Sequence, residues 1–143
     1  MDDHYSPRPV AGWFKLAAIA SVLWLAIGCA LYLYEVSLDP AKLPLDERAM
    51  YDALPTWMWA AFAIAVWVGL AGTVLLFLRR KLAEPLMLVS LIASLAQNSA
   101  YFIDPKLRGT LGSEEFLLPI ILVAVEWTIF WFARHSRQRG WLR

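Results

Sequence analysis

Four long apolar stretches decide what this chain can fold into. Each has roughly the 17–25 residues that a helix needs to cross the hydrocarbon core of a bilayer. Within lipid, a single spanning segment satisfies its own backbone hydrogen bonds only as a helix. The predicted spans are 13–34, 57–78, 86–103 and 117–133. Because 60% of the residues are hydrophobic and no connection is longer than 35–56, we predict a single membrane domain over 1–143.

The basic residues are concentrated at alternate ends of these stretches. Nine of the 13 Lys and Arg residues flank the two termini or connect the second span to the third. These nine are Arg8, Lys15, Arg79, Arg80, Lys81, Arg134, Arg137, Arg139 and Arg143. The connections 35–56 and 104–116 carry eight acidic residues and only four basic ones. Because Lys and Arg accumulate on the cytoplasmic side, we predict that both termini are cytoplasmic and that these two connections face outward.

The connections are short enough to join neighbouring antiparallel helices, which favours an all-α membrane protein with an up-down-up-down four-helix bundle. In the first outer connection, residues 46–54 begin with acidic residues and place apolar residues at near-helical spacing. This pattern predicts a short interfacial helix. In the second outer connection, Gly109 and Gly112 are typical of turns.

Residue types needed for metal binding or conventional catalysis are scarce. Cys29 is the one cysteine, which excludes a disulfide within the chain and a cysteine-based metal cluster. His4 and His135 lie in the polar ends of the chain, where we do not expect buried ligands. The sequence contains no recognisable pair of catalytic carboxylates, activated nucleophile or glycine-rich phosphate loop. We therefore predict no enzyme activity, no metal and no cofactor.

The basic run 134–139 directly follows the last span. A basic segment in this position normally meets anionic lipid headgroups. We therefore expect the chain to contact the lipid bilayer and not nucleic acid.

Glu126 is the one acidic residue deep inside a predicted span. It lies nine residues into the fourth span, about 14 Å along the helix axis and near the middle of the bilayer. A carboxylate there costs roughly 2.5–3.5 kcal/mol on insertion scales, so the side chain should face protein or water. Two roles are open: a group that couples protons or binds a cation, or a neutral acid that links helices by hydrogen bonds.

Polar residues recur at helical spacing in the third span. They are Ser90, Ser94, Gln97 and Asn98. Counted from the outer ends of the spans, Ser94 lies at the depth of Glu126. The pattern predicts a small polar pocket between the third and fourth spans that opens toward the outer face. The same residues are equally suited to hydrogen bonds that hold helices together.

Small residues repeat every four positions in the second span, at Ala61, Ala65, Gly69 and Thr73. Such a ridge lets another helix approach closely, either from the same chain or from a partner.

Three tryptophans lie near the middle of their spans instead of at the interface. They are Trp24, Trp67 and Trp127. We expect them to fill the bundle core; the alternative is that they line a site for an apolar or ring-shaped ligand.

Several segments together resemble a family of small bacterial four-span proteins. The resemblance is strongest over 54–91 and covers most of the chain. It is carried by Leu23-Trp24, Leu54-Pro55-Thr56-Trp57, 61–69, Gly72, Leu78-Arg79-Arg80-Lys81, Ala83, Pro85-Leu86, Ser90-Leu91 and Gly140-Trp141-Leu142. Members are often labelled sugar transporters, which implies a bacterial inner-membrane protein. Ala26 stands where the family pattern has an asparagine, and Glu126 is not part of that pattern.

Two functional hypotheses follow from these patterns. The first is a transporter of solutes, sugars by the family label, that acts as a homo-oligomer because four helices alone pack solid. The second is a non-catalytic accessory or assembly subunit of a larger membrane complex.

Overall fold

The computed structural model describes residues 9–143. Residues 1–8, which include His4 and Arg8, lie outside the described part. Four helices within 9–143 are long and apolar enough to cross a membrane. They are α1 (Phe14–Ser37), α3 (Thr56–Phe77), α4 (Ala83–Ile103) and α6 (Leu117–Gln138). The predicted all-α four-helix fold is confirmed, and the chain is a multi-pass membrane protein.

Three of these helices extend past the predicted limits of the spans. Helix α1 continues to Ser37. Helix α4 begins at Ala83, so Pro85 lies in its first turn, where a helix does not need the missing N–H. Helix α6 continues to Gln138, and Arg137 in its last turn suits the negative end of the helix dipole.

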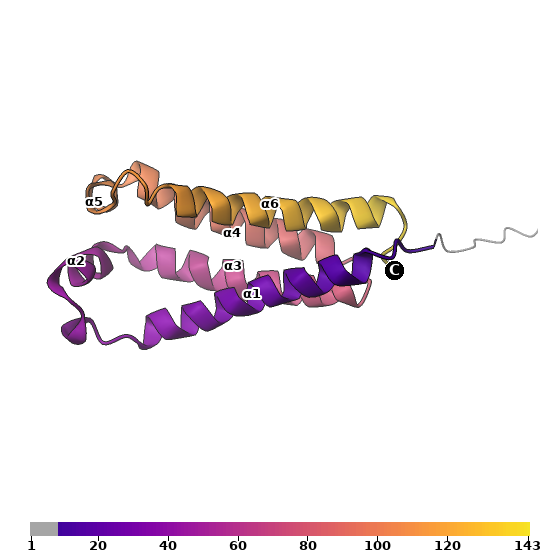
Figure 1. The fold of residues 1–143 in the computed structure, drawn as a ribbon, viewed down its shortest axis with the longest axis horizontal. Helices are drawn as coiled ribbons and strands as arrows, with labels where there is room; N and C mark the ends of the chain where they lie inside the picture. Colours follow the sequence, from indigo (N-terminus) through magenta and orange to yellow (C-terminus); the bar gives the residue numbers. More distant parts are fainter. Residues whose placement is uncertain (1–8) are drawn as a thin grey trace, which may run out of the picture.

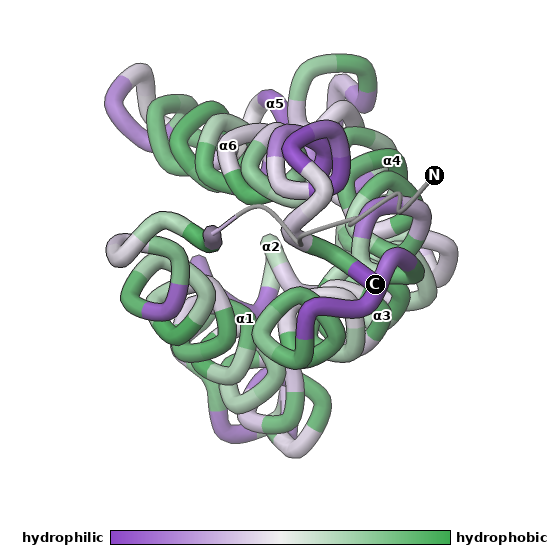
Figure 2. Tube along the Cα trace, turned by 90° about the vertical axis from the view of Figure 1, so that its right-hand side faces the viewer, coloured by the Kyte–Doolittle hydropathy of each residue, from purple (hydrophilic) through white to green (hydrophobic). Residues whose placement is uncertain are grey.

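The bundle has two chemically different ends (Figure 1). The start of α1, the turn 79–81 between α3 and α4, and the C-terminal segment 139–143 lie together at one end, which we call the basic end. The short helices α2 (Leu45–Ala53) and α5 (Pro105–Thr110) lie at the opposite end, which we call the acidic end. Between the two ends, hydrophobic residues cover all sides of the long helices (Figure 2).

The long helices pack in the order α1, α3, α4, α6, each against the next. The closest approach is at Gly69 of α3. A Cβ atom there would lie 2.6 Å from Leu25 Cδ1 of α1 and 2.6 Å from Ser90 Oγ of α4. Only the missing side chain of glycine lets both neighbours approach at this point.

The ridge of small residues is used inside the chain. Ala65, Gly69 and Thr73 are buried, and Ala61 is half-buried. The ridge therefore packs against α1 and α4 and is not free to receive a partner helix.

A small cap covers the acidic end of the bundle. Helix α2 lies within one residue of the predicted interfacial helix, and a 3-10 turn, η1 (Pro40–Lys42), precedes it. The expectation of turns around Gly109 is wrong, because this residue lies in helix α5. The signal for α5 is Asp104, whose side chain accepts a hydrogen bond from the backbone N–H of Lys106 and so caps the helix.

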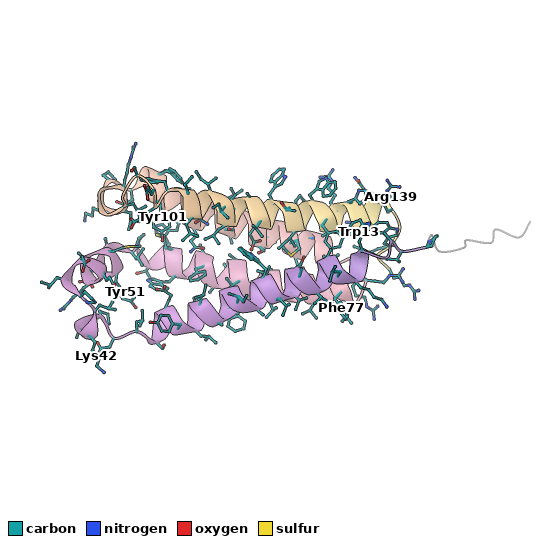
Figure 3. All side chains as sticks on the ribbon, viewed as in Figure 1. Trp13, Lys42, Tyr51, Phe77, Tyr101 and Arg139 are labelled. Atoms are coloured by element: carbon teal, nitrogen blue, oxygen red, sulfur yellow. The ribbon has the colours of Figure 1, made fainter. Side chains whose placement is uncertain are left out.

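The basic end is tightly packed. Phe14 of α1 contacts Phe132 of α6 at a ring-centroid distance of 5.4 Å, and Trp141 of the C-terminal segment at 5.9 Å. Trp13 also contacts Phe132 and Trp141, and Figure 3 shows it at the same end as Arg139. These aromatic contacts join α1 to α6 where the bundle is closed.

Candidate intramembrane site

Glu126 lies inside the bundle, with its carboxyl group turned toward α4. The residue is only 6% exposed although α6 forms one edge of the helix arrangement. Its Oε2 atom lies 3.1 Å from Ser90 Oγ, and Ser90 is fully buried. The expectation that this acid faces protein is therefore met, and its direct partner is a serine hydroxyl.

Ser90 joins three helices through one hydroxyl group. Its Oγ atom also lies 2.6 Å from the backbone carbonyl oxygen of Ala65 in α3. A serine hydroxyl has a single proton to donate, and a carbonyl oxygen has none. Both contacts are therefore full hydrogen bonds at the same time only when Glu126 is protonated and donates to Ser90. The two salt bridges in residues 9–143 both lie elsewhere, at Arg48–Asp52 and Arg137–Glu84.

A cavity of about 190 Å³ lies beside this junction. Glu126, Ser94, Gln97 and Asn98 supply its polar lining, and these are the residues of the predicted pocket. They lie from the middle of the bundle toward the acidic end, because α4 runs from the basic end to the acidic end. The remaining lining is mostly apolar and comes from α1, α3 and Leu122 of α6.

The polar wall of the cavity belongs mainly to α4. Ser94 and Asn98 are buried, and Asn98 Nδ2 donates to the backbone carbonyl of Ser94 at 2.8 Å. The side-chain oxygen of Asn98 and the hydroxyl of Ser94 are thus left at the cavity side of the helix. These groups can bind a ligand that carries hydroxyl or amide groups.

A second cavity of about 190 Å³ lies closer to the acidic end. It shares Phe62 and Gln97 with the first, and its lining also includes Glu35 and Tyr101. Gln97 therefore stands between the cavity that holds Glu126 and the surface at the acidic end. Sequence reasoning did not identify Glu35 or Tyr101, because each is a single polar residue at the end of an apolar helix.

The partner of Glu126 differs from the predicted one by one helical turn. Ser94 was expected at its depth, but the contact is with Ser90, four residues or about 6 Å nearer the basic end. The estimate placed the outer ends of the third and fourth spans at the same level. The connection between them contains α5 and a further turn, and it starts α6 deeper than α4 ends.

The tryptophans do not fill the bundle core, so that expectation is wrong. Trp24, Trp67 and Trp127 are 36%, 43% and 57% exposed on the outer surface of the helices. The helices approach each other through small residues, and an indole ring has no space there. Only Trp24 also lines the cavity, and Trp67 instead contacts Tyr32 edge to face.

Sequence reasoning also missed a direct bond between α1 and α3. Cys29 Sγ donates to the backbone carbonyl of Val66 at 3.3 Å, and both residues are buried. Within residues 9–143, no three His, Cys, Asp or Glu side chains gather closely enough to hold a metal ion.

Comparison with protein-family models, with curated proteins and with solved structures finds no match to this chain. The arrangement of its own residues is therefore the basis for a functional proposal.

Proposed function

We propose that this protein is a solute transporter of the bacterial inner membrane and that the cavity beside Glu126 is its solute site. The observation that carries the proposal is an acidic side chain, buried at mid-bilayer depth, that forms part of a cavity wall together with Ser94, Gln97 and Asn98. Intramembrane acids that face a cavity are typical of proton and substrate pathways. The resemblance to a family labelled as sugar transporters points in the same direction.

The two ends of the bundle support a direction of access. The cavities lie in the half toward the acidic end, whereas the basic end is filled by the aromatic contacts of Phe14, Phe132 and Trp141. With the termini cytoplasmic, as the charge distribution favours, the solute would enter from outside. Passage to the other side then requires the contacts at the basic end to open.

The proposed oligomer has to form through a face other than the small-residue ridge. Ala65, Gly69 and Thr73 are already buried within one chain. The lipid-facing sides of α1 and α6, with exposed residues such as Ile27 and Trp131, are the surfaces left for a second copy.

Transport is tested with purified protein in vesicles. The assay measures entry of radiolabelled glucose and other monosaccharides under an imposed proton gradient, while a pH-sensitive dye inside the vesicles reports proton entry. We expect the Glu126→Gln variant to lose proton-coupled uptake, because an amide keeps the hydrogen bond to Ser90 but cannot release a proton.

The matched control is Glu47→Gln, which removes an exposed acid of α2 outside the bundle. It should leave uptake unchanged. Full uptake by the Glu126→Gln variant would remove this acid from the mechanism, and no uptake of any sugar by the unaltered protein would contradict the transport proposal.

A second candidate is an accessory subunit of a larger membrane complex. The observation that favours it is the apolar side of the cavity, where Trp24, Ile27 and Leu31 of α1 are exposed to the surroundings. A helix of another protein lying against this side would complete the wall. Affinity purification from native membranes in mild detergent distinguishes the two: a stoichiometric partner supports the subunit, and a homo-oligomer alone supports the transporter.

A further inference from the structure

A third cavity lies at the basic end, away from Glu126. Its volume is about 450 Å³, and it is formed between the α3–α4 turn and the C-terminal segment. Its charged lining consists of Arg79, Lys81, Arg137 and Arg143, and Gln138, Gly140 and Leu142 complete the wall.

The backbone around this cavity is held in place by specific bonds. The N–H of Lys81 donates to the carbonyl of Arg143 at 2.9 Å, and the N–H of Arg143 donates to the carbonyl of Arg79 at 2.6 Å. The guanidinium Nε of Arg79 donates to the carbonyl of Trp141 at 2.8 Å. Arg79 has a φ of 61° and Gly140 a φ of 71°, so both chain reversals use the left-handed conformation. The cationic side chains are therefore attached to a fixed frame.

The positive charge in the cavity exceeds the negative charge that faces it. Arg137 bonds to Glu84 at 2.7 Å, and this is the one salt bridge at the basic end among residues 9–143. Arg79 bonds to a neutral carbonyl, and the side chains of Lys81 and Arg143 have no acidic partner in the described part. Like charges held close together repel each other unless an anion lies between them.

The position of the cavity indicates which anion it meets. Leu78 and Leu82 flank the basic turn in sequence and are 57% and 64% exposed, as lipid-facing residues are. Trp13 and Trp131, exposed at the same end, mark the depth of the membrane interface. A phosphate group with acyl chains attached would place its charge in the cavity and its chains beside Leu78 and Leu82.

We propose that this cavity binds the phosphate group of an anionic phospholipid. Arginine and lysine side chains on the fixed turn and the C-terminal segment hold the headgroup, and its chains stay in the bilayer. The site is independent of the cavity at Glu126 and of any transport activity. Bound lipid would tie the C-terminal segment to the α3–α4 turn.

The test compares two double variants that remove equal charge from the same end. Lys81→Gln with Arg143→Gln changes the cavity, and Arg134→Gln with Arg139→Gln changes basic residues that do not line it. Native mass spectrometry of the full chain in detergent measures retention of phosphatidylglycerol against phosphatidylcholine. The electrolyte is about 0.5 M, because salt at this level screens diffuse attraction between exposed charges.

We expect the cavity variant to bind phosphatidylglycerol roughly tenfold more weakly, since each basic contact contributes modestly. The control variant should stay within about twofold of the unaltered protein, where only screened charge is lost. Equal loss in both variants, or equal retention of the two lipids, would overturn the proposal. Displacement of the lipid by about 10 mM inorganic phosphate would overturn the lipid assignment in favour of a soluble phosphate.

Folding is checked by circular dichroism and elution volume. Both substituted side chains are exposed, and the bonds that hold the frame are made by the backbone of Lys81 and Arg143. The single variant Lys81→Gln replaces the double variant if the latter elutes as an aggregate, and the same comparison then applies.

Discussion

Ser90 shows how a single hydroxyl group joins three helices inside the bilayer. It lies 2.6 Å from the Ala65 carbonyl of α3 and 3.1 Å from the Glu126 carboxyl of α6, while it belongs to α4. In hydrocarbon no water replaces a lost partner, so buried polar groups have to pair within the protein. The same hydroxyl thereby keeps Glu126 in its position at the cavity.

Replacing Ser90 with alanine removes both contacts. We expect the free energy of unfolding to fall by about 1 kcal/mol, the usual size of hydrogen bonds between membrane helices. The measurement is unfolding in mixed detergent micelles by increasing amounts of dodecyl sulfate. Ser99→Ala is the control, because that hydroxyl only bonds to the Ala96 carbonyl of its own helix. A loss of the same size in both variants would contradict a linking role for Ser90.

Residue identity in the sequence indicates the polar candidates but not their partners. Glu126 and the stripe of polar residues in α4 are recognisable because polar side chains inside a span are costly and therefore informative. Which serine faces Glu126 depends on the relative heights of two helices. A shift of one turn changes the partner from Ser94 to Ser90 while both remain on the same face of α4.

At the scale of elements, the contact between helices is set by Gly69. Leu25 Cδ1 and Ser90 Oγ would both lie 2.6 Å from a Cβ atom at this position. Leu25 is 1% exposed and Ser90 is hydrogen-bonded, so neither can move aside easily. The packing of α1 and α4 on α3 depends on this one missing side chain.

The substitution Gly69→Ala tests this dependence. Overpacking a tight contact costs typically about 1–3 kcal/mol, and we expect a loss of stability in that range. Gly109→Ala is the control, because a Cβ atom there meets nothing within 4 Å and alanine suits the helix α5. Thermal unfolding in detergent compares the two variants; a Gly69→Ala protein as stable as the control would show that the helices can separate at no cost.

Elements differ in how clearly the sequence shows them. The four long helices are evident because about twenty consecutive apolar residues have few other stable structures in lipid. The short helix α5 was missed because a helix of this length depends on its cap at Asp104 and on burial of Leu107, not on a long periodic pattern. Glycine at 109 favoured a turn in the sequence, whereas the structure accommodates it in the helix.

At the scale of the whole molecule, the asymmetry between the ends carries the orientation. The turn 79–81 and the C-terminal segment lie together at the basic end, and α2 and α5 with their acidic residues lie at the other (Figure 1). Both termini leave the bundle from one end because the number of crossings is even. Positive charge at that end favours the cytoplasmic side.

The orientation is tested with reporter fusions in a bacterial host. We expect green fluorescent protein fused after Arg143 to fluoresce, and alkaline phosphatase fused after Gly112 to be active, since each reporter works on one side of the membrane only. The matched controls exchange the two reporters. Fluorescence from the Gly112 fusion together with phosphatase activity at Arg143 would reverse the orientation.

The sequence by itself determined the four crossings, the class of fold and the polar residues that a site would use, because the bilayer imposes length and penalises charge residue by residue. Only the tertiary structure decided how those residues combine. It placed Ser90 opposite Glu126, used the small-residue ridge within the chain, and turned the tryptophans outward. The physical reason is that height and rotation of packed helices depend on contacts between distant segments, which no pattern within one segment records.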